Sequence, residues 1–328
     1  MAKKDFLPGS KLGKEQEDIL NNRNDSSFIV KGCAGSGKSL IALHKAKQIA
    51  ALGESYTIVV YTKSLRKYFE DGLRKLGLKN VYHYHQWRHN QRRVKYLIVD
   101  ECQDFSPFQI MLLKNTNPGA TFSLVGDLYQ GVRADEGIRS WDEWKEPVFE
   151  NRAELKQLTV SYRNTVEIMS LAQAVAARYP IAGVGETRPV LRHGETPGIL
   201  RAGNEKERLR LIRDQVQAWL DGGYHSIALM EKTEEQARKL FRQIDPGLNA
   251  RLLSETDADY RGGVMILPAG IAKGMEFDCV GICDASAENF PDDEFLCRVL
   301  YVMMTRPLHR LCIWYRGEPS PLLPDGQV

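Results

Sequence analysis

The sequence lacks a long hydrophobic run and a strong excess of one charge. No apolar stretch approaches the ~20 residues that a membrane-spanning helix requires, so we expect no membrane partner. The formal net charge is only +3 over 328 residues. Global charge therefore gives no argument for nucleic-acid binding, and a basic surface would have to come from local clustering.

Cysteine is also sparse, and its spacing is uninformative for metal binding. The six cysteines include no C-x-x-C pair, so neither a zinc site nor a disulfide framework is indicated. We interpret them as reduced thiols of a cytoplasmic protein.

Short aliphatic runs that alternate with helical patterns are abundant. The runs are Phe28–Val30, Thr57–Tyr61, Tyr96–Val99, Thr121–Val125, Ser226–Met230, Val264–Leu267, Cys279–Ile282 and Leu311–Trp314. Helical spacing is found in Leu40–Leu52, Leu65–Leu76, Ser106–Lys114, Thr165–Arg178, Glu205–Leu220 and Thr233–Ile244. This alternation predicts an α/β fold in which helices cover parallel sheets. The chain length suits two domains, and the mixed-charge segment Glu143–Leu158 predicts a boundary that gives domains 1–150 and 151–328.

A phosphate-binding loop follows the first apolar run. The pattern G-x-x-x-x-G-K-[ST] is complete from Gly32 to Ser39, with Ala34, Gly35, Ser36, Gly37 and Lys38 between. Glycines let backbone N–H groups converge on phosphate oxygens, and the helix that follows presents its positive end. We therefore predict that the loop binds a nucleoside triphosphate, with Lys38 on the β- and γ-phosphates and Ser39 on Mg²⁺. A glycine-rich turn without a ligand is the alternative.

A second apolar run ends abruptly in acidic residues, at Asp100 and Glu101. A carboxylate is a hard oxygen ligand that Mg²⁺ prefers, so Asp100 is a candidate metal ligand. Glu101 is a candidate general base for an attacking water. The alternative is a solvated acidic strand end.

Further motifs make the chain resemble superfamily-1 helicases of the UvrD/Rep-like group. The matching segments, in chain order, are Gln16, the phosphate loop, D-E-C-Q-D at Asp100–Asp104, G-D-L-Y-Q at Gly126–Gln130, Y-R-N at Tyr162–Asn164, K-G-M-E-F at Lys273–Phe277, E-N-F-P at Glu288–Pro291 and L-Y-V-M-M-T-R at Leu300–Arg306. They extend over almost the whole chain.

The resemblance implies two RecA-like P-loop NTPase domains with ATP and Mg²⁺ in the cleft between them. It implies that Gln16 reads adenine, that Gln130 senses the γ-phosphate and that Tyr162 stacks on the base. Arg163 and Arg306 would contact the γ-phosphate, and Glu276 would belong to the nucleotide site. The expected activity is ATP hydrolysis coupled to translocation on single-stranded nucleic acid, DNA in preference to RNA, with 3′-to-5′ polarity in a DNA helicase.

The interval Tyr61–Lys95 is the candidate path for that strand. Its basic residues are Lys63, Arg66, Lys67, Arg74, Lys75, Lys79, Arg88, Arg92, Arg93 and Lys95, and its aromatic residues are Tyr61, Tyr68, Phe69, Tyr82, Tyr84 and Trp87. Basic groups follow phosphates and aromatic rings stack on bases. The alternative is a solvated basic helix above buried aromatic side chains. His83, His85 and His89 lack the cysteine or acidic neighbours that would favour a metal site.

Several strand-facing positions depart from the family pattern. No aromatic residue follows Gln130 in Gly131–Glu136, Pro268 and Gly270 stand where the fifth motif has threonine and histidine, and Leu40 replaces a basic residue. The intervals that carry accessory subdomains in longer relatives are short here. These departures favour a second hypothesis, an ATP-driven conformational switch that acts on a protein partner such as a nuclease, without unwinding.

Overall fold

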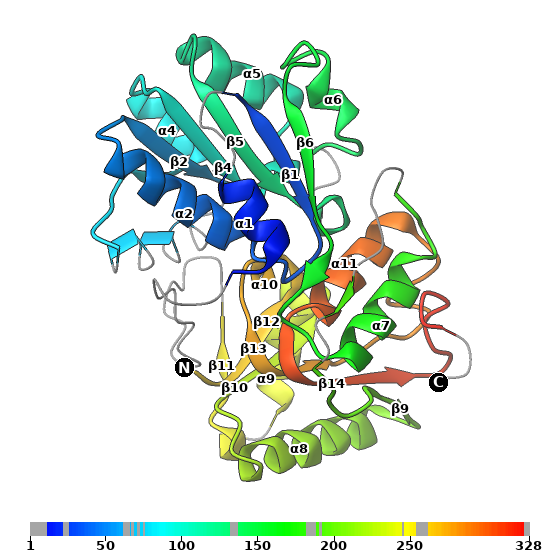
Figure 1. Ribbon diagram of the computed structural model, residues 1–328. Helices are drawn as coiled ribbons and strands as arrows, with labels where there is room; N and C mark the ends of the chain where they lie inside the picture. The colour runs from blue at the N-terminus through cyan, green and yellow to red at the C-terminus, as the bar shows by residue number, and fades with distance from the viewer. Residues whose placement is uncertain are drawn as a thin grey trace. The chain divides into compact units, whose positions relative to one another are not determined.

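The described part of the chain contains two six-stranded sheets, and the strands within each sheet are parallel (Figure 1). The computed structural model describes residues 12–21, 26–61, 66, 69–70, 73–74, 76–131, 137–181, 188–189, 192–244, 246–253 and 262–324. These residues form two units. The N-terminal unit extends to Ser161 and includes Ile181 and Arg188, while the C-terminal unit contains Tyr162–Pro180 and the described residues from Pro189 onward.

The N-terminal unit is built on a sheet with strand order β3-β2-β4-β5-β1-β6. Its strands are β1 (Phe28–Gly32), β2 (Tyr56–Val60), β3 (Val81–His83), β4 (Tyr96–Asp100), β5 (Thr121–Gly126) and β6 (Glu154–Leu158). Its helices are α1 (Lys14–Leu20), α2 (Lys38–Ala51), α4 (Tyr84–Asn90), α5 (Pro107–Thr116) and α6 (Asp142–Lys145). Short 3₁₀ turns, Cys102–Asp104 and Leu128–Gln130, follow β4 and β5.

Both faces of this sheet are buried, which explains the nearly continuous apolar sequence of its central strands. On one face, residues of α1 and α2 such as Ile19 and Ile41 pack with Ile58 of β2. On the other face, Trp87 of α4 and Ile110 of α5 belong to one core with β4 and β5. The carboxyl ends of β1, β4 and β5 lie side by side, because β5 pairs with both neighbours.

The C-terminal unit has its own sheet, with strand order β11-β12-β10-β13-β14-β9. The strands are β9 (Gly198–Ala202), β10 (Ser226–Glu231), β11 (Arg251–Leu252), β12 (Gly263–Pro268), β13 (Phe277–Ile282) and β14 (Pro307–Arg316). The helices are α7 (Val166–Ala176), α8 (Glu205–Asp221), α9 (Glu234–Gln243), α10 (Ala269–Ala272) and α11 (Glu294–Met304). Helices α8 and α9 share one hydrophobic core with the sheet, and α11 packs against α7, α10 and β13. A two-residue pair, β7 (Val160–Ser161) with β8 (Arg188–Pro189), and a 3₁₀ turn at Pro246–Leu248 complete the described elements.

The predicted fold class, α/β with parallel sheets flanked by helices, is confirmed. Seven of the eight predicted apolar runs lie within strands, the eighth, Thr57–Tyr61, extends one residue beyond β2, and five of the six helical patterns are helices. Much of the sixth, Leu65–Leu76, lies outside the described residues. Strand β6 pairs with β1 in the first sheet, so the N-terminal unit continues past residue 150 to Ser161.

Among the described residues, no helix has the length and hydrophobicity needed to cross a bilayer. All six cysteines are free thiols with buried side chains.

Candidate nucleotide-binding site

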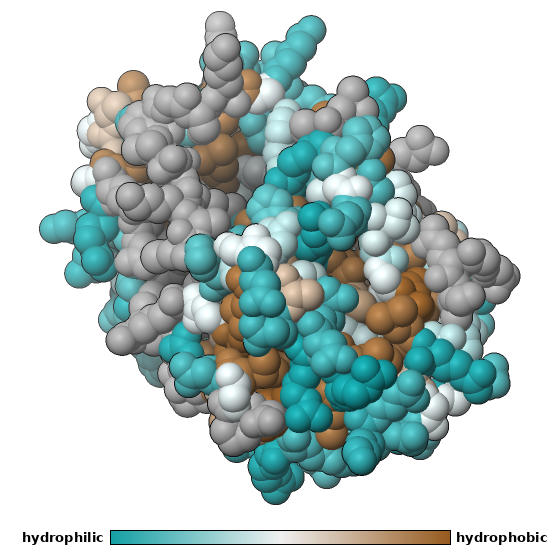
Figure 2. All heavy atoms as spheres, turned by 90° about the horizontal axis from the view of Figure 1, so that it is seen from below, coloured by the Kyte–Doolittle hydropathy of each residue, from teal (hydrophilic) through white to brown (hydrophobic). Residues whose placement is uncertain are grey.

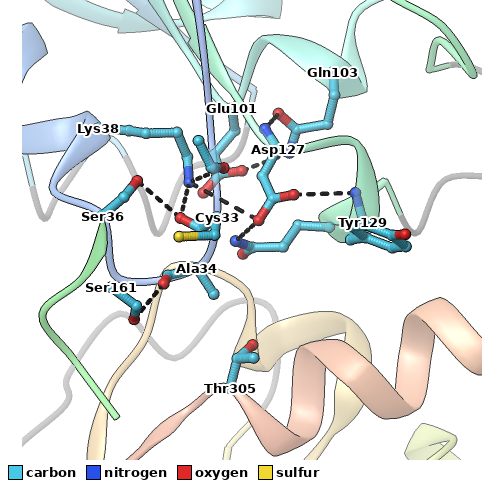
Figure 3. A network of polar contacts seen from close by, with 12 residues as sticks. Cys33, Ala34, Ser36, Lys38, Glu101, Gln103, Asp127, Tyr129, Ser161 and Thr305 are labelled. Atoms are coloured by element: carbon cyan, nitrogen blue, oxygen red, sulfur yellow. Dashed lines mark hydrogen bonds and ion pairs between the residues drawn. The ribbon is translucent and has the colours of Figure 1, made fainter. Parts of the chain in front are cut away.

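The phosphate loop joins β1 to α2 in the geometry that the sequence predicts. Gly35 and Gly37 have φ values of 74° and 85°, a left-handed conformation that glycine adopts without strain. Lys38 begins α2 and folds back over the loop, where its Nζ donates to the carbonyl oxygens of Gly32 at 2.9 Å and Cys33 at 2.7 Å (Figure 3). The lysine is nearly buried, so its charge is held within the loop.

Gln16 lies directly against this loop. Its Nε2 donates to the Ser36 carbonyl at 2.8 Å, and its Oε1 accepts from the Gly13 N–H at 2.9 Å. A Cβ added to Gly37 would lie 2.3 Å from Gln16 Nε2, so the Gln16 amide would have to move aside, and the φ of 85° also favours glycine. The amide thereby fixes α1 to the loop. The proposed reading of adenine by this side chain remains a prediction.

The two predicted Mg²⁺ ligands meet at the carboxyl end of β4. Ser39 Oγ donates to Asp100 Oδ2 at 2.7 Å. Burial and the neighbouring charge of Glu101 raise the pKa of Asp100 to about 7. A buried carboxylate with this preference for the neutral form is one whose ionised form a divalent cation would stabilise. The hydroxyl and carboxylate oxygens are the hard donors that Mg²⁺ prefers, so these residues fit that metal.

Glu101 sits beside Asp100 in an unusual backbone conformation. Its φ of 50° is left-handed, a conformation that costs free energy in a residue with a side chain and that is concentrated at functional sites. Its Oε2 accepts from Gln103 Nε2 at 2.6 Å. The candidate base is therefore held in one orientation by a neighbouring amide.

Gln103 connects the candidate base Glu101 to strand β5. It is not among the site residues that the sequence predicts. Its Oε1 accepts from the Asp127 N–H at 2.9 Å, so one side chain bridges the D-E-C-Q-D segment and the end of β5 (Figure 3). Gly126 allows this close approach, because a Cβ there would lie 2.5 Å from Gln103 Oε1. The signal that could have identified Gln103 was its fixed place within the D-E-x-Q-D motif.

Asp127 joins Gln130 to the lysine. Asp127 Oδ2 accepts from Gln130 Nε2 at 2.8 Å and lies 3.9 Å from Lys38 Nζ. Burial is the main cause that raises the pKa of Asp127, and the Lys38 charge acts in the opposite direction. The structure thus brings together Lys38, Ser39, Asp100, Glu101 and Gln130 within the N-terminal unit.

A second cluster of predicted residues lies in the C-terminal unit. Arg163 Nε and Nη2 each lie 2.6 Å from Glu276 Oε1, and Arg163 Nη1 donates to the Thr305 carbonyl at 3.3 Å. Arg306 is fully buried, and its Nε donates to the Val302 carbonyl at 2.9 Å. Tyr162 by contrast leaves 46% of its surface exposed. The fourth, fifth and sixth motifs therefore meet at the amino ends of β13 and β14.

The predicted strand path needs a correction. Tyr61, Phe69, Tyr84 and Trp87 are buried in the core of the N-terminal unit, and Tyr61 packs edge-on against Phe105 with ring centroids 5.2 Å apart. These rings fill the space beside the sheet, so they cannot stack on bases as proposed. Arg88, Arg92 and Arg93 are exposed, as a solvated basic surface requires. Residues 62–65, 67–68, 71–72 and 75 of this stretch, including Lys63, Lys67, Tyr68 and Lys75, lie outside the described residues.

Comparison with known proteins gives one family match. The family described as viral superfamily 1 RNA helicase core domain matches residues 28–143, from β1 into α6. The matched residues contain the phosphate loop and the Asp100–Asp104 segment, so the match is to part of the chain that carries the candidate site. A search of curated proteins finds no match.

Many solved structures match this chain, and three of them have the following similarity. The C-terminal domain of a possible DNA helicase from Lactobacillus plantarum WCFS1 is 24% identical, with a TM-score of 0.42 over 51% of this chain and 96% of that one. Arterivirus nonstructural protein 10, a helicase, is 15% identical, with a TM-score of 0.49 over 92% of this chain. Its complex with DNA is also 15% identical, with a TM-score of 0.47 over 92% of this chain. This chain covers 61% and 62% of those two arterivirus chains.

Proposed function

We propose that the protein is a Mg²⁺-dependent ATPase of the UvrD/Rep-like group that couples hydrolysis to movement along single-stranded nucleic acid. The observation that carries this proposal is the arrangement around the phosphate loop. Ser39 and Asp100 present adjacent oxygens, Glu101 follows directly, and Lys38 lies within the loop. A metal ligand set, a general base and a phosphate-binding lysine are the minimum that phosphoryl transfer to water requires.

Each residue has a distinct task in this proposal. The loop N–H groups and Lys38 bind the phosphates, and Lys38 exchanges its two carbonyl partners for phosphate oxygens. Ser39 and Asp100 would hold Mg²⁺, which supplies positive charge to phosphate oxygens when bound. Glu101 accepts a proton from the attacking water, and Gln103 keeps its carboxylate oriented.

The C-terminal unit contributes arginines in this proposal. Arg163 and Arg306 contact the γ-phosphate when the units close on ATP, and Tyr162 stacks on the base. Arginines supplied in this way are worth about 10³–10⁵ in rate in other nucleotide hydrolases. Because they would act only in the closed arrangement, hydrolysis becomes coupled to motion of the units.

Single-stranded nucleic acid is the proposed track. The exposed Arg88, Arg92 and Arg93 supply positive charge for phosphates without base specificity. The proposed polarity is 3′ to 5′, as the resemblance implies. DNA is the polymer that the resemblance favours, and RNA is the one named in the description of the matched family.

A second candidate is an ATP-driven switch read by a protein partner. The burial of Tyr61, Tyr84 and Trp87 favours it, because that burial removes stacking platforms from the predicted strand path. Hydrophobic surface also favours it, because Figure 2 shows hydrophobic areas on the face seen from below.

The deciding experiment is steady-state ATP hydrolysis with Mg²⁺, alone and with saturating single-stranded DNA or RNA, using Lys38→Ala as the blank. Stimulation of at least tenfold by one polymer supports the motor and identifies its track. Robust hydrolysis that ignores both polymers supports the switch. Hydrolysis by Lys38→Ala at the wild-type rate would refute the nucleotide site itself.

A further inference from the structure

Residues 192–194 form a clasp over the beginning of α7. The Arg192 carbonyl accepts from the Val166 N–H at 3.0 Å, and the Gly194 N–H donates to Glu167 Oε2 at 2.8 Å. A Cβ added to Gly194 would lie 2.7 Å from Thr165 Cγ2, so the clasp fits closely against the helix cap. His193 Nδ1 also lies 2.8 Å from Glu167 Oε1, so three successive residues fix this segment to α7 although it has no regular secondary structure.

The side chain of Arg192 reaches beyond the clasp to two other segments. Its Nη2 donates to the carbonyl oxygen of Arg163 and to that of Leu308, the latter at 2.5 Å. Arg163 belongs to the Y-R-N motif before α7, and Leu308 lies at the start of β14, two residues after Arg306. One guanidinium nitrogen therefore ties together the backbones that carry the two predicted phosphate-contacting arginines.

A second contact joins the same two segments but does not involve the main-chain carbonyl of Arg163. Asn164 Nδ2 donates to the Pro307 carbonyl at 2.6 Å, which joins the segments one residue after Arg163 and one residue before Leu308. The Arg163 side chain is directed by Glu276, whereas its main-chain carbonyl is held by Arg192. A charged donor on a main-chain carbonyl is among the stronger hydrogen bonds, and Arg192 is half-buried, where such bonds are least weakened by water.

We propose that Arg192 is a positioning residue for ATP hydrolysis: it fixes the main chain of Arg163 relative to that of Arg306, so that both guanidinium groups reach the phosphates together. This inference rests on the proposed function of Arg163 and Arg306. Arg192 itself contacts neither the nucleotide nor the attacking water. Displacing a catalytic group by a fraction of its contact distance lowers turnover more than it weakens ground-state binding.

The test compares Arg192→Met with a matched control. Arg201→Met makes the same replacement at an exposed position on β9 of the same unit. kcat and KM for ATP are measured for both, for Arg163→Ala and for the double variant Arg163→Ala with Arg192→Met. Binding of a fluorescent ATP analogue reports separately whether each variant is folded.

We expect Arg192→Met to lower kcat at least tenfold with KM changed less than twofold, and Arg201→Met to match the wild type. Because Arg192 acts through Arg163, its replacement in the Arg163→Ala background should lower kcat by less than twofold more. Arg192→Lys keeps the charge and a donor, so it should recover part of the lost rate.

Three outcomes would overturn the inference. If Arg192→Met leaves kcat unchanged while Arg163→Ala lowers it, Arg192 has no positioning role and the proposed function of Arg163 survives. If Arg192→Met lowers kcat equally with and without Arg163, it acts independently. If Arg163→Ala itself leaves kcat unchanged, the proposed function of that arginine fails first, and the role of Arg192 fails with it.

Discussion

At the scale of single residues, Gln103 does what no ionised carboxylate could do in its place, because it both donates and accepts a hydrogen bond. Its amide donates to Glu101 and accepts from the Asp127 main chain. The side chain is completely buried, so water cannot substitute for either partner. The orientation of the candidate base is thus tied to the position of β5.

Gln103→Glu should separate these two contacts. The carboxylate can still accept from the Asp127 N–H, but it cannot donate to Glu101 and places a second negative charge beside it. We expect kcat for ATP to fall at least tenfold with nucleotide affinity retained. Gln217→Glu, an exposed substitution on α8, is the control. Normal turnover by Gln103→Glu would show that Glu101 needs no orienting donor.

Asp100 should make the stability of the protein pH-dependent. Burial and Glu101 raise its pKa to about 7, whereas in the unfolded chain it titrates near its ordinary value of about 3.9. Between these values the folded state retains a proton that the unfolded chain has released. The free energy of unfolding therefore falls as pH rises through that interval.

Asp100→Asn removes this titration. Without nucleotide or Mg²⁺, we expect the variant to match the wild type near pH 4 and to be more stable by about 2–4 kcal/mol near pH 8. Urea unfolding at several pH values measures the difference. Asp142→Asn, exposed at the start of α6, should leave the wild-type profile unchanged. If the free energy of unfolding depends on pH in the same way for Asp100→Asn and wild type, Asp100 does not cause the pH dependence.

At the scale of elements, helix α2 is flanked by two glycines in the left-handed conformation, and the two have different surroundings. Gly37 precedes the helix with φ 85° and lies against Gln16, whereas Gly53 follows it with φ 72° and has open space around it. Alanine at either position costs about 1–2 kcal/mol from backbone strain. Only at Gly37 does the added Cβ also collide with a neighbour.

Gly37→Ala and Gly53→Ala should therefore destabilise the protein similarly but differ in nucleotide binding. We expect Gly37→Ala to weaken binding of an ATP analogue at least tenfold, because Gln16 must move away from the phosphate loop. Gly53→Ala should bind as the wild type does. Thermal unfolding and analogue titration together make the comparison, and equal affinities would mean that the Gln16 contact is dispensable.

Sequence patterns predict the elements with strong periodicity and miss those defined by their partners. Val99 and Val125 lie in apolar strands that the pattern identified, since both faces of that sheet are buried. The sequence pattern did not predict strand β6, because its residues are mostly polar and it pairs along only one edge, with β1. The sequence also did not predict the burial of Tyr84 and Trp87, because aromatic residues are found both in cores and on surfaces that stack on bases.

At the scale of the whole molecule, binding of single-stranded nucleic acid should depend on where the positive charge of the protein lies rather than on its net charge. Replacing Arg88, Arg92 and Arg93 together with glutamate should weaken single-strand binding at least tenfold. It should also reduce the steepness of its salt dependence by about 0.7 in log–log slope for each lost phosphate contact.

The matched control changes three exposed arginines of the C-terminal unit, Arg178, Arg201 and Arg242, to glutamate. Both triple variants have the same net charge, so fluorescence anisotropy against salt concentration distinguishes a local site from a general charge effect. If both lose affinity equally, the strand path lies elsewhere or binding is non-specific.

The burial of all six native thiols has a practical consequence for testing the proposed motor. A maleimide dye should react far faster with a cysteine introduced on the surface of each unit than with any native one. A donor–acceptor pair could then be attached to otherwise unaltered protein, and single-molecule fluorescence transfer would follow the separation of the units through each cycle of ATP turnover.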